Sequence, residues 1–249
     1  MSTLLKPLRR YRKLATKKGR LETGVFLVEG DRAIKQIIAS HPEEIIEILT
    51  VEEPLPIYRN YRVRLLTESQ FLSICITRTP QGSMAVVNMP ADIYSDYLPE
   101  DAGNKILLLE DIQDPGNVGT LIRTAAAFDF SGVIMTENCA DPLSPKCVQA
   151  TAGTVLSVWL RRTIHYLELA VALRKDGYTL IATELNGIAE PSIISSQSKI
   201  LLALGNEAAG LSKALLSTAD YRLRIPTIRE KAESLNVAAC GAIFMYLSS

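Results

Sequence analysis

The segment KILLLEDIQDPGNVGTLIRTAAAF, residues 105–128, indicates a strand, a turn and a helix in immediate succession. Its apolar run Ile106–Leu109 is typical of a strand buried on both faces, as in a parallel sheet covered by helices. A Pro-Gly turn then precedes Asn117, the predicted N-cap of the helix. A second apolar run, Ile200–Leu204, predicts another buried strand of the same sheet.

Arg123 lies within this predicted helix, among alanine, leucine and isoleucine residues. A guanidinium in such surroundings is expected to have a partner, because unpaired buried charge is costly. A salt bridge or a side chain that reaches solvent explains an isolated arginine of this kind, so Arg123 by itself indicates no function.

Strands and helices alternate along both halves of the chain, which predicts an α/β fold. In the second half the predicted strands are Lys105–Glu110, Gly132–Thr136, Ser157–Arg161, Thr179–Thr183, Lys199–Gly205 and Tyr221–Ile225, and the predicted helices are Asn117–Phe128, Pro145–Gly153, Leu167–Asp176, Ser212–Ser217 and Ser234–Tyr246. In the first half the predicted strands are Gly24–Gly30, Glu44–Val51, Arg62–Leu66 and Met84–Asn88, with a helix capped by Asp31 and another at Glu68–Ile74. The predicted domains are residues 1–95 and 105–249, joined by a linker at 96–104.

The composition excludes several classes of protein. Of 249 residues, 47% are apolar and 22% charged, which is ordinary for a globular chain. No apolar run approaches the length of a membrane span, and no secretory signal is recognisable. The four cysteines form no CxxC pair and there are only two histidines, so we expect no disulfide framework and no metal site. These features predict a cytoplasmic protein.

The charges balance overall, with 27 basic and 27 acidic residues, but they are unevenly distributed. No acidic residue occurs from Met1 to Leu21, where the basic residues are Lys6, Arg9, Arg10, Arg12, Lys13, Lys17, Lys18 and Arg20. Such a block suits a polyanionic partner such as nucleic acid. A solvated amphipathic helix also explains it, because leucines and Tyr11 recur near helical spacing.

Two further loops follow predicted strands, and ligands of parallel sheets bind beyond the carboxyl ends of strands. In Ala203–Ser212, Gly205 permits close backbone approach, Gly210 permits a positive φ and Glu207 lies between them. In Ile225–Ala239, Ser234 begins a helix of small residues. Each loop alone is explained by helix capping and solvated charge.

Together the three loops resemble the motifs of the SpoU (TrmH-like) class of the SPOUT RNA methyltransferases. The matching residues are Asn117, Gly119, Arg123, Thr124, Ala125, Ala127 and Phe128 of NxGxxxRTAxAF, then Leu204, Gly205, Asn206, Glu207, Gly210, Leu211 and Ser212 of LGNExxGLS, and finally Ile225, Pro226, Ser234, Leu235, Asn236 and Val237 of the IP and SLNV motif. The chain departs from the usual pattern at Asp129, Thr227 and Ala238. The N-terminal half, including FLVEG, resembles the RNA-recognition module of the class.

The resemblance implies a C-terminal, mostly parallel sheet with helices on both faces and a deep trefoil knot, preceded by a small α/β RNA-recognition module. It implies S-adenosylmethionine (SAM) as cofactor and a ribose 2′-hydroxyl of structured RNA as methyl acceptor, with rRNA favoured over tRNA. It also implies a homodimer whose site is completed across the interface, with no metal and no membrane partner.

The resemblance also implies roles for individual residues. The catalytic set is Arg123, Asn117, Glu207, Ser234 and Asn236; the cofactor-binding set is Thr183, Gly205, Asn206, Ile225, Thr227 and Leu235; the RNA-binding set is Arg9, Arg10, Lys17, Lys18 and Arg20. An arginine pKa above about 12 makes a literal base unsuitable, so we expect Arg123 to stabilise a developing alkoxide. Glu207 is expected to pair with Arg123 or to orient it.

Two other functions remain open from the sequence. Some relatives in the superfamily methylate bases, although NxGxxxR together with SLN favours ribose. The second alternative is a non-catalytic RNA-binding or ribosome-assembly protein. The presence of Asn117, Arg123, Glu207 and Asn236 together argues against it, because such a protein has no need of them. An ordinary nucleotide-binding α/β protein is disfavoured, because neither GxGxxG nor a P-loop occurs.

Overall fold

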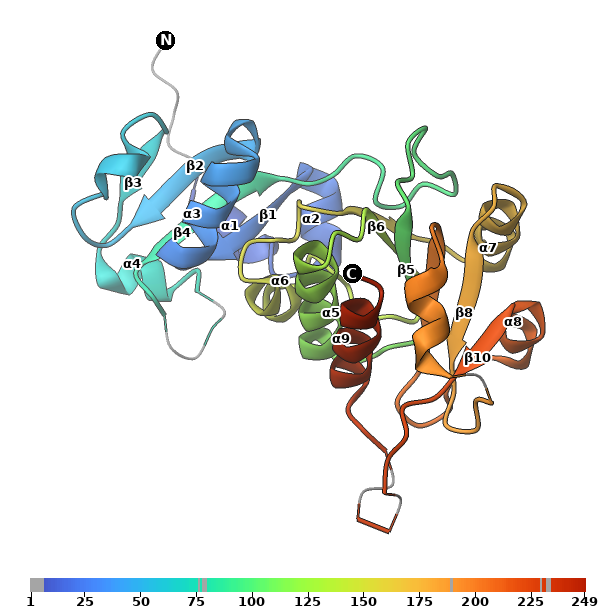
Figure 1. Ribbon diagram of the computed structural model, residues 1–249. Coiled ribbons are helices and arrows are strands. Elements are labelled where there is room, and N and C mark those ends of the chain that lie inside the picture. The colour runs from blue at the N-terminus through green and yellow to red at the C-terminus, as the bar shows by residue number, and fades with distance from the viewer. Residues whose placement is uncertain (1–6, 76, 78–79, 189, 229, 232–233) are drawn as a thin grey trace. The chain divides into compact units, whose positions relative to one another are not determined.

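The computed structural model describes residues 7–75, 77, 80–188, 190–228, 230–231 and 234–249 (Figure 1). The chain forms two compact units. One unit comprises residues 1–91 together with 141–156, and the other comprises residues 92–140 and 157–249. The segment 141–156 therefore belongs to the first unit, although in the sequence it lies between two strands of the second.

The second unit is built on a six-stranded sheet in which all neighbouring strands are parallel. Its strands are β5 (Lys105–Leu109), β6 (Gly132–Met135), β7 (Trp159–Arg162), β8 (Thr179–Thr183), β9 (Ile200–Leu204) and β10 (Tyr221–Leu223). The order across the sheet is β10-β8-β9-β5-β6-β7. Ile106–Leu109 and all of β9 are buried, as predicted from their apolar runs.

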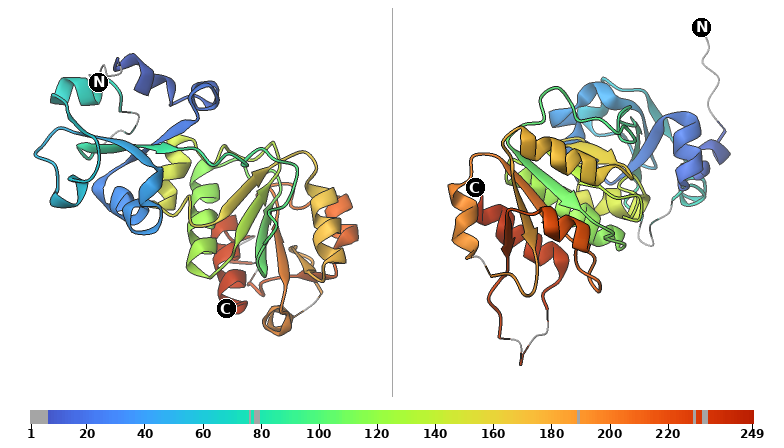
Figure 2. Two further views of the ribbon diagram at one scale, coloured as in Figure 1. Left: turned by 90° about the horizontal axis from the view of Figure 1, so that it is seen from above. Right: turned by 90° about the vertical axis from the view of Figure 1, so that its right-hand side faces the viewer.

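Helices cover both faces of this sheet (Figure 2). One face carries α5 (Pro115–Ala127) and α9 (Val237–Leu247), and the other carries α7 (Tyr166–Lys175) and α8 (Lys213–Thr218). A short 3₁₀ helix, η3 (Pro191–Ser196), precedes β9. Gly241 permits α9 to lie close to α5, because a Cβ there would be 2.3 Å from Leu121 Cδ2. The predicted fold class is confirmed, whereas the trefoil knot stays a prediction.

The first unit is a small α/β module, as predicted, with the strand order β1-β4-β2-β3. Its strands are β1 (Val25–Glu29), β2 (Ile45–Thr50), β3 (Val63–Leu65) and β4 (Ser83–Asn88). Its helices are α1 (Arg9–Lys13), α2 (Lys17–Thr23), α3 (Asp31–Ser40), α4 (Glu68–Leu72) and α6 (Pro145–Thr151), with 3₁₀ turns η1 (Pro42–Glu44) and η2 (Pro56–Tyr58). Asp31 is the first residue of α3 rather than its cap, which is Gly30.

The basic segment forms two short helices, α1 and α2, instead of one amphipathic helix. Thr16 caps α2 by accepting a hydrogen bond from the backbone N–H of Gly19 at 3.1 Å. The apolar side of the segment does pack as the spacing suggests, because Tyr11 and Leu14 are buried in the core of the unit. The Tyr11 hydroxyl donates to Glu47 at 2.7 Å, which fixes α1 to the sheet.

The starts of α7 and α8 differ from the predicted ones by one residue, and those of α5 and α9 differ by two and three residues. Helix α5 starts at Pro115, and the Asp114 side chain caps it by accepting from the Asn117 backbone N–H at 3.0 Å. Proline is well suited to this first position because an N–H there would have no acceptor within the helix, so its absence costs no hydrogen bond. Helix α9 starts at Val237 and is capped by Asn236, three residues later than the predicted start. Asn117 therefore lies inside the first turn, and its side chain is not used as a cap.

Candidate active site

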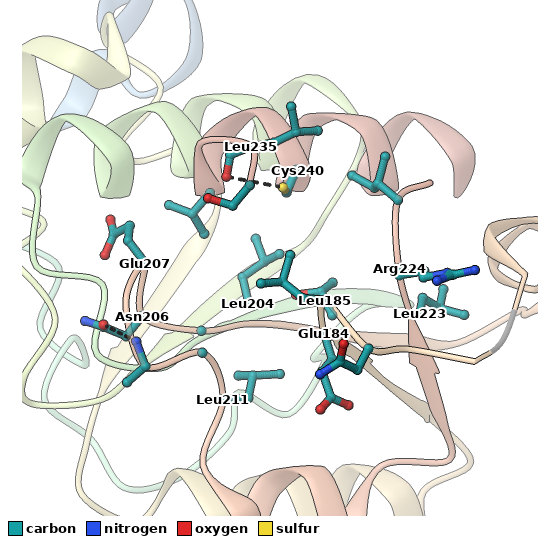
Figure 3. Close-up of a pocket in the computed structure, with 18 of the residues that line it drawn as sticks. Glu184, Leu185, Leu204, Asn206, Glu207, Leu211, Leu223, Arg224, Leu235 and Cys240 are labelled. Carbon is teal, nitrogen blue, oxygen red and sulfur yellow. Dashed lines mark hydrogen bonds between the residues drawn. The ribbon is translucent and has the colours of Figure 1, made fainter. Parts of the chain in front are cut away.

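A cavity of about 320 Å³ lies at the carboxyl ends of strands β8, β9 and β10 (Figure 3). This volume is within the range of sites for small molecules. All six residues predicted to bind the cofactor line it, namely Thr183, Gly205, Asn206, Ile225, Thr227 and Leu235. Glu207 and Ser234, which were predicted to be catalytic, line it as well.

The loop between β9 and α8 folds back on itself at the cavity. The Gly210 N–H donates to the Asn206 carbonyl at 2.9 Å, and Gly210 has a φ of +69°. A Cβ on Gly205 would be 2.4 Å from the carbonyl carbon of Gly210, closer than real Cβ atoms approach. The close approach expected of Gly205 and the positive φ expected of Gly210 are both found.

The Asn206 side chain holds this loop in place. Its Nδ2 donates to the carbonyl of Asp111 at 2.8 Å, and its Oδ1 accepts from the N–H groups of Ala208 and Ala209, both at 2.9 Å. Asp111 itself has a φ of +57° and accepts hydrogen bonds from Thr136 and Asn138, so it is firmly fixed. The Asn206 amide thus supports the cavity wall.

Three residues from the three predicted motifs form one hydrogen-bonded chain beside the cavity. Asn236 Nδ2 donates to Asn117 Oδ1 at 3.1 Å, and Asn117 Nδ2 donates to Glu207 Oε1 at 2.8 Å. The remaining amide oxygen, Asn236 Oδ1, accepts from the N–H groups of Ala238 at 2.9 Å and Ala239 at 3.4 Å. Segments 119 residues apart in the sequence are therefore brought together at one point.

Arg123 reaches solvent, one of the two explanations given for an arginine in this helix, and within the described part of the chain it lacks the partner expected for a buried guanidinium. It is exposed on α5, and no described residue forms a hydrogen bond or ion pair with it. Its neighbours Leu121, Ile122 and Ala125 are buried while Arg123 is not, so the guanidinium needs no buried partner. Glu207 pairs with Asn117 instead. The structure thus joins Asn117, Glu207 and Asn236 but leaves Arg123 on the surface.

The cavity fits a cationic adenosine derivative such as SAM. Its walls include the apolar side chains of Leu204, Leu223 and Phe244, which suit a purine ring. Among the described residues of the lining, the two carboxylates, Glu184 and Glu207, outnumber the one arginine, Arg224, and so favour a ligand with positive charge. Burial raises the pKa of the Cys240 thiol, which also lines the cavity. This cysteine is therefore a neutral, weakly polar part of the wall rather than a nucleophile.

The predicted RNA-binding residues differ in how exposed their side chains are. Arg9, Arg10, Lys17 and Lys18 are exposed on α1 and α2. Arg20 is only 3% exposed: it donates to the carbonyl of Leu14 at 2.7 Å and to that of Ala15 at 3.1 Å, and it forms an ion pair with Asp141. Its guanidinium is occupied within the first unit, so we assign it a structural role.

The SpoU rRNA Methylase family model matches residues 104–246, which is more than half of the chain. The chain belongs to the SpoU rRNA methylase family. The family model of an MRM3-like substrate binding domain matches residues 6–85. This membership confirms the resemblance drawn from the three motifs, and with it the enzyme class, a SAM-dependent RNA methyltransferase.

Relatives of known name agree with this membership. The chain is 33% identical over 241 residues to the 23S rRNA (guanosine(2553)-2′-O)-methyltransferase RlmP of Bacillus subtilis, covering 95% of this chain and 93% of the relative. The crystal structure of the SpoU methyltransferase AviRb of Streptomyces viridochromogenes with AdoMet has a TM-score of 0.82 at 26% identity, covering 97% and 96% of the two chains. An AdoMet-bound rRNA methyltransferase of Sinorhizobium meliloti has a TM-score of 0.80 at 28% identity, covering 100% and 96%.

The sequence did not single out several residues of the cavity. Glu184, Leu185 and Asn186 line it from the loop after β8, and Cys240 lines it from α9. The position of Glu184 immediately after a parallel strand was a usable signal, because that edge of the sheet forms the site. Cys240 gave no signal, since its approach to the cavity depends on how α9 packs.

The described residues lack features of two other kinds of site. They contain no group of three or more histidine, cysteine, aspartate or glutamate side chains that could hold a metal ion. Within the same residues, no helix has both the length and the apolar character needed to cross a bilayer.

Proposed function

We propose that this protein transfers a methyl group from SAM to a ribose 2′-hydroxyl of RNA, with rRNA as the substrate class. The observation that carries the proposal is the position of Glu207, which lines the cavity and is also hydrogen-bonded to Asn117 of the Asn236–Asn117–Glu207 chain. The cofactor cavity and the polar groups suited to acceptor chemistry are therefore contiguous. The similarity to RlmP, whose name specifies a guanosine 2′-O position of 23S rRNA, supports the substrate class.

The residues of this chain would act on the acceptor. When bound, SAM supplies an electrophilic methyl group, and the attacking hydroxyl becomes a better nucleophile as its proton leaves. The Asn117–Glu207 pair offers fixed polar groups next to the cavity, where the hydroxyl would be oriented. An exposed guanidinium at Arg123 would stabilise the developing alkoxide or clamp an adjacent phosphate.

The first unit would hold the RNA. Arg9, Arg10, Lys17 and Lys18 present positive charge on two consecutive short helices, and Tyr11 fixes the first of these to the sheet. Neutralising phosphates in this way releases counterions and gives affinity without a sequence code. The match of residues 6–85 to a substrate-binding domain supports this role. The RNA substrate in turn supports a cytoplasmic location.

We also propose that two copies form the working enzyme and that Arg123 of one copy serves the cavity of the other. Arg123 lies about 9 Å along the α5 axis from Asn117, at 1.5 Å per residue. On α9, which packs against α5, Ile243 and Tyr246 are 38% and 64% exposed, which leaves apolar side chains suited to association. A second copy docked on the α5–α9 face would bring Arg123 near a bound substrate.

Methylation of isolated rRNA tests the proposed reaction. Purified protein is incubated with rRNA and methyl-labelled SAM, and the product is digested to nucleosides for mass spectrometry. The expected product is a 2′-O-methyl nucleoside at a single position, where alkaline hydrolysis is blocked. Label on a base would assign the protein to base methylation, and SAM binding without any transfer would favour the non-catalytic binder.

A further inference from the structure

Glu110 is a buried carboxylate that the cavity lining does not include. It follows β5 directly, is 4% exposed, and its backbone N–H donates to the carbonyl of Leu204 at the end of β9 at 2.9 Å. Burying a carboxylate in such a place is costly unless its oxygens accept hydrogen bonds. The partners of its two oxygens therefore indicate which elements Glu110 holds together.

Both oxygens of Glu110 are used, each by a different element. Oε1 accepts from the Tyr166 hydroxyl, at the start of α7, at 2.6 Å. Oε2 accepts from the backbone N–H of Ser212 at 2.6 Å. Burial and the adjacent Glu110 raise the pKa of Tyr166 to about 12, so this hydroxyl keeps its proton at neutral pH and remains a donor.

Ser212 marks the end of the loop that folds around the cavity. It is the N-cap of α8, where its hydroxyl accepts from the Leu215 N–H at 3.2 Å. The loop begins at Gly205, directly after β9, and its start is held by Asn206 on the carbonyl of Asp111. Two consecutive residues after β5, Glu110 and Asp111, thus hold the end and the start of the same loop.

We infer that Glu110 is a positioning residue for cofactor binding, which acts through Ser212 and Tyr166 to hold the 205–212 loop in the shape that lines the cavity. The inference rests on the proposed function, because it takes the occupant of this cavity to be SAM. Glu110 does not touch the cavity itself. Its loss would therefore affect SAM binding through the loop, whereas Asn117 and Asn236 lie outside the loop and would stay in place.

The test compares SAM binding by full-length variants, measured by calorimetry without RNA. We expect Glu110→Ala to raise the Kd for SAM about tenfold or more and Tyr166→Phe to raise it about fivefold, since hydrogen bonds to charged groups are among the stronger ones. Glu110→Gln should bind within about threefold of the unchanged protein, because its amide oxygen can still accept from Ser212 and the Tyr166 hydroxyl can accept from its NH₂ group.

Tyr58→Phe is the matched control. The Tyr58 hydroxyl donates to Asp31 at 2.6 Å, so this variant also loses a buried tyrosine–carboxylate hydrogen bond, but in the other unit and far from this loop in the chain. It should lower thermal stability as Tyr166→Phe does, without changing the Kd for SAM. In turnover assays, Tyr166→Phe should raise KM for SAM by a larger factor than it lowers kcat, because only Glu207 of the acceptor groups lies in the loop, and KM for RNA should stay unchanged.

The results discriminate between a positioning role and a purely structural one. If Glu110→Ala does not fold, Tyr166→Phe decides. A change in the Kd for SAM with Tyr166→Phe that is no larger than with Tyr58→Phe overturns the inference. Absence of SAM binding by the unchanged protein would instead contradict the proposed function, so the two failures are distinguishable.

Discussion

The cofactor cavity and the exposed face of α5 differ in how far one chain satisfies their polar groups. Around the cavity, Asn206, Asn117 and Asn236 each use side-chain atoms in hydrogen bonds with neighbouring loops. On the exposed face, Arg123 has no polar partner among the described residues. The asparagines around the cavity are thus satisfied within one chain, whereas Arg123 is the group that we propose meets a substrate or a second copy.

Replacing Arg123 should give the largest difference between an effect on methyl transfer and an effect on SAM binding. We expect Arg123→Ala to lower the rate of methyl transfer about 10²–10³-fold, as loss of an electrostatic stabiliser does, and to change the Kd for SAM by less than about twofold. Single-turnover rates and calorimetry measure the two effects. Arg123→Lys, the matched control, keeps the charge but loses the planar fork, and should recover only part of the rate. Transfer at the unchanged rate would remove Arg123 from the mechanism.

A substitution that fills the cavity should weaken SAM binding, which Arg123→Ala should leave nearly unchanged. A β-branched side chain in Gly205→Val cannot fit where even a Cβ would be 2.4 Å from Gly210, so we expect the Kd for SAM to rise more than tenfold. Gly177→Val is the control, since a Cβ at Gly177 would meet no atom within 4 Å, while its φ of +87° still strains a valine. It should lose stability and keep its affinity for SAM. Equal affinities in the two variants would contradict the placement of SAM.

Asn236 is hydrogen-bonded to Asn117, which in turn is hydrogen-bonded to Glu207 at the cavity. In Asn236→Asp the side chain can still cap α9, but it cannot donate to Asn117, so we expect thermal stability to be nearly unchanged. The rate of transfer should fall about tenfold, the equivalent of one lost hydrogen bond. Asn236→Ala, which also loses the cap, should cost about 1 kcal/mol of stability in addition. An Asp variant with full activity would show that the hydrogen-bonded chain is not needed.

The basic helices allow a smaller effect to be measured in the first unit. The double variant Arg9→Ala, Arg10→Ala should weaken RNA binding several-fold and reduce the dependence of log K on log salt by about 1.4, if each arginine contacts one phosphate of single-stranded RNA. Its melting temperature should not change. Arg20→Ala should instead lower the melting temperature, because Arg20 is buried and paired with Asp141. Loss of RNA affinity only in the Arg20 variant would reverse our assignment.

The smallest effect concerns stability and pH. Burial opposes the charge of Asp220, but hydrogen bonds from Arg174 and from the Leu180 N–H outweigh it and lower the pKa of Asp220 below its ordinary 3.8. A lowered pKa contributes stability above the unfolded pKa, and this contribution is lost as pH falls through the folded pKa. Asp220→Asn should therefore melt about 2–4 °C lower at pH 7. The difference should shrink below pH 4, and a constant difference would contradict this origin.

The sequence predicted which motifs lie together better than it predicted the surroundings of individual side chains. The convergence of Asn117, Glu207 and Asn236 follows from topology, because parallel strands end at one edge of the sheet. The burial of Arg20 did not follow, since its partner Asp141 is 121 residues away and belongs to a segment that joins the first unit. The exposure of Arg123 depends on which side of α5 is covered by α9, and spacing in the sequence does not specify that.

Mixed oligomers test most directly whether a second copy completes the site. Two tagged full-length chains, one with Arg123→Ala and the other with Gly205→Val, are co-expressed and purified by both tags. In such a pair, one cavity remains intact and faces an intact Arg123 only if the arginine acts across the interface. We predict that the mixed oligomer regains methyl transfer far above either variant alone. Activity no higher than that of the separate variants would show that Arg123 acts within its own chain.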